Sequence, residues 1–110
     1  MTDRELDSLI AERVMGWKVF AGDPGYGRPP GNHPLSLVLD VLPNYSTSIV
    51  EAWQVVEKMR GDYELDLSDH VTYWTARFTK ARSTSPHVIE AETAPLAICR
   101  AALKALEITP

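Results

Sequence analysis

The stretch AGDPGYGRPPGNHP, residues 21–34, places four prolines and four glycines in fourteen positions. Proline removes a backbone N–H donor and glycine loses the most conformational entropy on ordering, so this composition predicts neither helix nor strand. The stretch separates two segments with helical patterns. We therefore expect a single domain over 1–110, with a Pro/Gly-rich loop at 21–44 inserted between its first two helices.

The overall composition is that of a folded protein in a reducing cytoplasm. A hydrophobic fraction of 45% with 24% charged residues argues against disorder. The net charge of −4 supplies no general attraction to nucleic acid or to anionic membranes. One cysteine, Cys99, cannot form an intramolecular disulfide. The charged N-terminus resembles no signal peptide, and no apolar run is long enough to cross a bilayer, so we expect neither secretion nor a membrane partner.

The first helix is predicted over residues 3–15. Thr2 and Glu5 have the spacing of a capping box, in which two side chains satisfy free backbone N–H groups at a helix start. Apolar residues then recur at helical spacing, and Gly16 follows the last of them, where a glycine commonly ends a helix.

Two further helices follow later in the chain. The second is predicted over 47–60, with an apolar stripe formed by Ile49, Trp53, Val56 and Met59 or Arg60. The last begins at Thr93 as the cap, with Pro95 in the first turn, where its missing N–H costs nothing. Its stripe is expected to be buried and contains Leu96, Cys99, Ala102, Leu103 and Leu106.

Three strands are predicted between these two helices, in the segments DYELDL (62–67), HVTYWTARFTKA (70–81) and HVIEA (87–91). Ser68 and Asp69 suit a tight hairpin connection between the first two. A short strand or packed extended segment is also indicated in LSLVLDVLP, residues 35–43. The order helix, loop, helix, three strands, helix predicts an α+β fold: a small antiparallel sheet of about three strands, with three helices covering at least one face, in a sandwich-like arrangement.

No motif with catalytic chemistry is present. The sequence lacks a phosphate-binding P-loop, a dinucleotide fingerprint after a strand, HExxH and CxxC. The histidines have no partner at metal-ligand spacing, and Cys99 lies on an apolar stripe. We therefore expect no enzymatic activity, no metal and no cofactor.

Two regions could nevertheless bind a ligand. Arg77 lies on the strand face opposite Trp74 and Phe78, and it is either a solvated surface residue or a guanidinium that recognises an anion. The opening loop is either a tolerated insertion or a stiff recognition segment. The candidate ligand-binding residues from both regions are Tyr26, Arg28, His33, Tyr45, Tyr73, Arg77, Arg82, Ser83, Ser85 and His87. Core packing is favoured over base stacking for Trp17, Trp53 and Trp74.

Three phrases carry a family resemblance: AERVMGWKV at 11–19, PNYSTSIVEAWQVVEKMR at 43–60 and APLAICRAALKALEI at 94–108. With the strands between them, they resemble the phage ABA-sandwich domain family of small bacteriophage and prophage proteins. The resemblance implies a phage accessory protein in the cytoplasm of a bacterial host, without a family reaction to carry over. The loop at 21–42 departs most from the family pattern.

Three classes of function remain open. The protein could sequester a small, anionic, nucleotide-derived immune signal, in a homo-oligomer whose interfaces form the pocket. It could instead bind and inhibit a host protein, which would require an exposed apolar patch such as Leu37, Leu39 and Val41, or Val71 and Tyr73. A minor enzyme is least favoured. Sequestration is placed first because Arg28, Arg77 and Arg82 occupy loop or strand-face positions in an acidic chain.

Overall fold

The fold is described from a computed structural model, which defines residues 2–19, 26–28, 40–80 and 88–106. Helix α1 spans Asp3–Ile10 and continues as a π-helical turn, η1, over Ala11–Met15. The Thr2 hydroxyl accepts the Glu5 backbone N–H at 3.2 Å, which confirms the cap. Gly16 ends the helix with a φ of 84°, a left-handed conformation that glycine adopts without steric cost.

Helices α2 and α3 span Ile49–Met59 and Ala94–Ala105. The Thr93 hydroxyl accepts the Leu96 backbone N–H at 3.4 Å, and Pro95 lies in the first turn, as predicted. Helix α3 is buried on most of its circumference because it contacts α1, α2 and a sheet. Its many alanines allow these neighbours to approach closely.

The larger sheet has the predicted three antiparallel strands, in the order β4-β5-β6. They span Tyr63–Asp69, Trp74–Lys80 and Ile89–Ala91. The predicted hairpin turn at 68–69 is wrong, because pairing continues to Asp69 opposite Trp74. The turn occupies residues 70–73 instead, and the His70 backbone N–H donates to the Tyr73 carbonyl at 2.8 Å.

A second, smaller sheet was not predicted, although its strand β3 lies within the segment 35–43, where a short strand or extended segment was indicated. Its strands β1 (Lys18–Val19), β2 (Tyr26–Arg28) and β3 (Asp40–Val41) pair antiparallel in chain order. The expectation that 21–34 contains no strand is therefore wrong for 26–28. A Cβ added to Gly27 would lie 2.9 Å from the Lys18 carbonyl oxygen. The glycine that argued against a strand is what allows these backbones to approach so closely.

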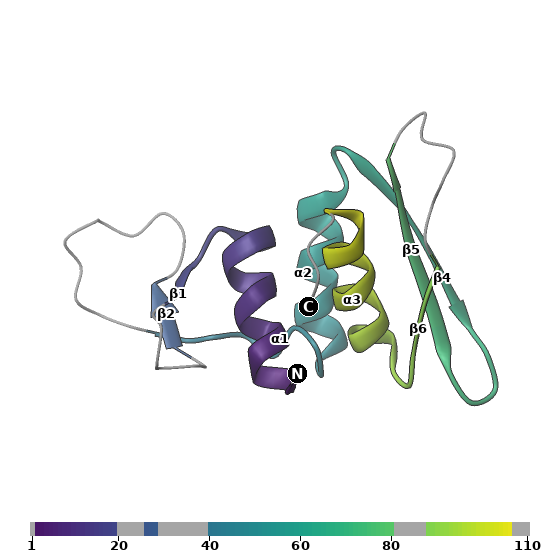
Figure 1. Ribbon diagram of the computed structural model, residues 1–110, viewed down its shortest axis with the longest axis horizontal. Coiled ribbons are helices and arrows are strands. Elements are labelled where there is room, and N and C mark those ends of the chain that lie inside the picture. Colours follow the sequence, from purple (N-terminus) through teal and green to yellow (C-terminus); the bar gives the residue numbers. More distant parts are fainter. Residues whose placement is uncertain (1, 20–25, 29–39, 81–87, 107–110) are drawn as a thin grey trace.

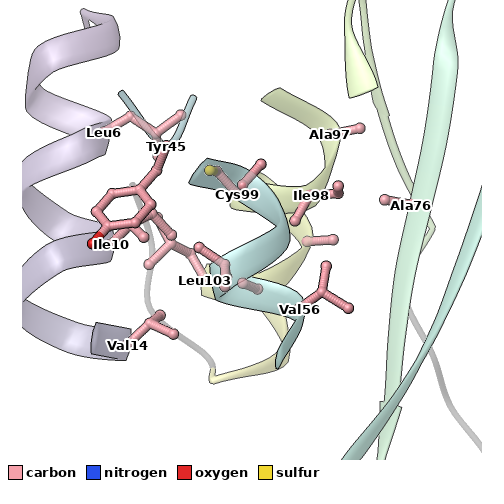
Figure 2. Packing of buried hydrophobic residues seen from close by; sticks show 14 of the residues in the cluster. Leu6, Ile10, Val14, Tyr45, Val56, Ala76, Ala97, Ile98, Cys99 and Leu103 are labelled. Atoms are coloured by element: carbon pink, nitrogen blue, oxygen red, sulfur yellow. The ribbon is translucent and has the colours of Figure 1, made fainter. Parts of the chain in front are cut away.

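The layers follow directly from these contacts. Figure 1 shows α1 between the small sheet and the pair α2 and α3, with the larger sheet on the far side of that pair. Figure 2 shows the core between α1, α2, α3 and β5, with Ile10, Tyr45, Ile98 and Leu103 at its centre. Among the described elements, helices cover only one face of the larger sheet.

A buried carboxylate fixes the start of α2 relative to α1. Asp7 is 1% exposed and accepts the Ser46 backbone N–H at 2.8 Å and an Arg4 guanidinium N–H at 3.0 Å. Arg4 also donates to the Asn44 side chain at 2.8 Å and to the Leu42 carbonyl at 3.2 Å. This network satisfies polar groups in the segment that leads from β3 into α2, so it sets where α2 begins.

Candidate functional site

Most of the predicted ligand-binding side chains lie outside the described part of the chain. Only the backbones of Tyr26 and Arg28 are described, and they lie in β2. Five further candidates lie outside the described residues altogether: His33, Arg82, Ser83, Ser85 and His87. The structure places three of the candidate side chains: Tyr45, Tyr73 and Arg77.

Tyr45 is a core residue and not part of a surface site. It is 1% exposed and packs among Leu6, Ile10 and Leu103. Burial raises the pKa of its hydroxyl to about 12, although a hydrogen bond with the Trp17 side chain works in the opposite direction. Its place in the turn sequence Pro43-Asn44-Tyr45-Ser46 suggested exposure. The Asp7 network instead draws this turn inward, so Tyr45 is unavailable to a ligand.

Arg77 lies on the uncovered face of the larger sheet, as predicted, but its charge is paired. Its Nε and one terminal nitrogen donate to the same oxygen of Asp66, at 3.1 and 2.6 Å. Asp66 is directly opposite Arg77 on the neighbouring strand, so the register creates this pair. Arg77 remains 37% exposed, and an anion bound there would have to compete with Asp66.

Tyr73 lies in the β4–β5 turn, away from both other candidates. Its ring stacks on His70, with ring centres 4.5 Å apart and planes within 8° of parallel. The neighbouring Val71 is fully exposed. The three described candidates thus lie in the core, on the outer sheet face and at the hairpin tip, and they do not form one site.

Nothing in the described residues indicates a catalytic or metal centre. Cys99 is completely buried, and burial raises the pKa of its thiol far above the ordinary value, so it is not an activated nucleophile. Within the same residues, no three potential metal ligands lie together. No helix in the described ranges is long and apolar enough to cross a membrane.

The surface that sequence reasoning missed lies on α2. Ile49, Val50 and Trp53, called the α2 stripe from this point on, are 48%, 72% and 42% exposed. The expectation that Ile49 and Trp53 belong to the core is wrong. The buried side of α2 is formed by Ala52, Val55, Val56 and Met59.

Ile49 and Trp53 are exposed because α2 is turned about its axis relative to the orientation that the sequence pattern predicted. The chain offers two apolar stripes on this helix, and the one containing Ala52 and Val55 faces α3. A hydrogen bond from the Asn44 backbone N–H to the Glu51 side chain ties the first turn of α2 to the segment before it. The signal was present in the sequence, because Ala52, Val55, Val56 and Met59 also recur at helical spacing.

Helix α2, which carries the stripe, leads into the edge strand of the larger sheet. Helix α2 contacts β4, and the apolar residues of β4 that face the helices, Tyr63, Leu65 and Leu67, are only half-buried. The corresponding residues of the central strand, Ala76 and Phe78, are fully buried. Apolar surface is therefore left partly uncovered both on α2 and on β4.

Residues 8–103 match the phage ABA sandwich domain, and the chain therefore belongs to that family. The chain is also similar to a phage protein from Bacillus cereus ATCC 14579 whose crystal structure has been solved. The two share 28% sequence identity over 100% of this chain and 92% of the other, with a TM-score of 0.78. No curated protein matches the sequence. The predicted family and α+β fold are confirmed.

The buried hydroxyl of Tyr45 predicts a loss of stability at alkaline pH. A raised pKa means that folding favours the neutral phenol, so its contribution is complete below pH 10 and is lost as the pH rises through about 12. The loss amounts to about 2–3 kcal/mol of unfolding free energy. Urea unfolding between pH 8 and 12 measures it, and Tyr45→Phe should abolish it.

Both proteins in this comparison should carry Cys99→Ala, because the buried thiol titrates in the same direction. An equally steep decline of stability between pH 10 and 12 with and without the Tyr45 hydroxyl would contradict the assignment.

Proposed function

We propose that this phage ABA sandwich protein acts without catalysis, by binding and inhibiting a protein of its bacterial host. The observation that supports the proposal is the α2 stripe, three large apolar side chains exposed together on one helix. Single exposed apolar residues are ordinary, whereas a contiguous group of them is typical of interaction surfaces. Inhibition of a host protein requires such a patch. Of the positions that the sequence indicated, Val71, Tyr73 and Val41 are exposed, and Leu37 and Leu39 lie outside the described residues. The α2 stripe is a further patch, with three such side chains on one helix.

The energetics of the stripe favour a protein partner. Fully burying an aliphatic or aromatic side chain contributes roughly 1.5–3 kcal/mol, and these three have about half of their surface left to cover, so together they can anchor an interface of moderate affinity. Trp53 is of a residue type enriched at binding hot spots. The rest of the exposed side of α2 is polar, including the Glu57–Arg60 ion pair at 3.2 Å, and would form the rim of such an interface.

Site-specific photo-crosslinking in a bacterial host tests this proposal. A photoreactive amino acid replaces Val50 in the stripe and, in a control protein, Lys104 on the exposed side of α3. We expect one discrete adduct with a host protein from position 50 and none from position 104. Adding Trp53→Ser should reduce the adduct at least tenfold, because the anchoring ring is removed. Adducts of equal yield from both positions, or none from either, would refute the proposal.

Sequestration of a nucleotide-derived immune signal is the second candidate function. The described residue that favours it is Arg77, a guanidinium on an uncovered sheet face with Thr75 and Thr79 on the same strand face. A phosphate could replace Asp66 as the acceptor of its two N–H groups. Further donors would come from other protomers of a homo-oligomer.

Native mass spectrometry with cyclic and ADP-ribose-type nucleotides tests this second function. We expect a stoichiometric mass increment on an oligomer and its loss in Arg77→Ala, with the fold intact, because an exposed ion pair contributes at most about 1 kcal/mol. Arg60→Ala, which removes another exposed ion pair, is the matched control and should bind normally. A monomer that gains no mass, or an unaffected Arg77→Ala variant, would exclude this function.

A further inference from the structure

We infer that the edge of β4 that no described strand pairs with accepts an extended, basic segment of the partner protein as a fourth strand, whose apolar side chains lie under Ile49 and Trp53 of the α2 stripe. This inference rests on the proposed function, since it names how and with what chemistry the partner binds. Added strands gain affinity from main-chain hydrogen bonds and specificity from alternate side chains.

The backbone of β4 provides the template. Strand β4 is seven residues long and, among the described strands, pairs only with β5. The N–H and C=O groups of every second β4 residue therefore point away from β5, toward the edge where an added strand could pair with them. Seven residues span about 23 Å, enough for three or four main-chain hydrogen bonds to an added strand.

Helix α2 leads directly into β4 and contacts it. The Asp62 backbone N–H donates to the Met59 carbonyl at 3.1 Å, so a tight turn connects the two elements, and Figure 1 shows β4 running back from that turn at an angle to α2. Measured from that turn, Trp53 lies about 12 Å along the helix and Leu65 roughly as far along the strand. Ile49 lies about 18 Å along the helix and Leu67 roughly as far along the strand.

The direction of the stripe follows from Val56. Figure 2 shows Val56 pointing from α2 toward the larger sheet. Trp53 and Ile49 precede it by three and seven residues, so they extend the same sheet-facing side of the helix. Val56 is buried, whereas Trp53 and Ile49 are exposed, and among the described strands the sheet ends at β4. One more strand would continue the sheet under both side chains.

The charges on β4 specify the occupant. Glu64 and Asp66 point to the outer face of the strand, Asp62 precedes it and Asp69 is its last residue. Asp66 is partly neutralised by Arg77, whereas none of the ion pairs among the described residues involves Glu64. A strand that alternates Lys or Arg with apolar residues would place its cations opposite this row and its apolar side chains under Trp53 and Ile49.

The same charges disfavour a second copy of this chain as the occupant. In an antiparallel β4–β4 pair, registers centred on Glu64, Leu65 or Asp66 set carboxylates directly opposite one another. Like charges in directly opposed positions destabilise a strand pair. Charge complementarity therefore selects a basic partner.

Peptide binding followed by NMR tests the inference on the intact protein. The probe is a capped nine-residue peptide of alternating Lys and Val, compared with a Glu/Val peptide and with a Lys/Val peptide N-methylated on alternate amides. We expect the Lys/Val peptide to shift the β4 amides and the Trp53 indole signal and to slow hydrogen exchange along β4. The acidic peptide should bind at least tenfold more weakly. The N-methylated Lys/Val peptide, in which the methyl groups replace the amide hydrogens that would face β4, should not bind.

A matched pair of variants locates the charge effect. Glu64→Lys should weaken binding of the Lys/Val peptide at least tenfold, whereas Glu90→Lys, on the same sheet face but on the opposite edge strand β6, should leave it unchanged. Equal binding of the acidic and basic peptides, shifts elsewhere, no binding at millimolar concentration, or a β4-paired dimer of the protein would each overturn the inference. If position 50 still crosslinks to a host protein in that case, the proposed function stands and only the mode of binding is wrong.

Discussion

The structure depends on one helix that is buried on nearly every side. Helix α3 contacts α1, α2 and the larger sheet at once, and its buried residues include Ala97, Ile98, Ala101, Ala102 and Leu103. A helix surrounded in this way must be apolar around most of its circumference and small where neighbours approach closely. The sequence APLAICRAALKA meets both requirements, with Arg100 and Lys104 as its exposed charges. The α3 contacts also fix which side of α2 is buried.

The exposed stripe is a consequence of that packing. Once Ala52 and Val55 face α3, Ile49 and Trp53 point to the side of Val56, toward the larger sheet, whose edge among the described strands is β4. The core therefore stops short of apolar residues that a continuing sheet would bury. The protein thus has a folded core and apolar side chains left exposed at one edge of it. The proposed partner strand would cover those side chains.

Sequence patterns predicted the elements but not how they are turned relative to one another. Caps at Thr2 and Thr93, the glycine stop at Gly16 and the alternation in β4 and β5 are local signals, and each was confirmed. Trp53 was predicted to be buried but is exposed, because the contact of α3 with α2 decides which side of α2 is covered. Tyr45 was predicted to be available to a ligand but is buried, because the hydrogen bond between Asp7 and Ser46 draws its turn inward. The strand at 26–28 was missed for a similar reason. Gly27 is required there because the Lys18 backbone lies too close to leave room for a side chain, and the sequence does not show that approach.

The candidate site illustrates the same limit. Arg77 was correctly placed on a surface face of the sheet by alternation alone, but its pairing with Asp66 required the register of the hairpin. The α2 stripe could not be separated from a core stripe on sequence, because both spacings are helical. What distinguishes them is the presence or absence of a neighbouring layer, and that is a property of the assembled fold.

The most direct measurement of the central claim is residue-resolved amide hydrogen exchange on the dilute, unliganded protein. If the edge of β4 is open, alternate amides of Tyr63–Asp69, those directed away from β5, should exchange as fast as exposed turns. Those directed toward β5 should be protected to the same degree as the centre of that strand. Uniform protection along both edges of β4 would show that another part of this chain, or a second copy, already covers the edge, and would contradict the claim that a partner strand can bind there.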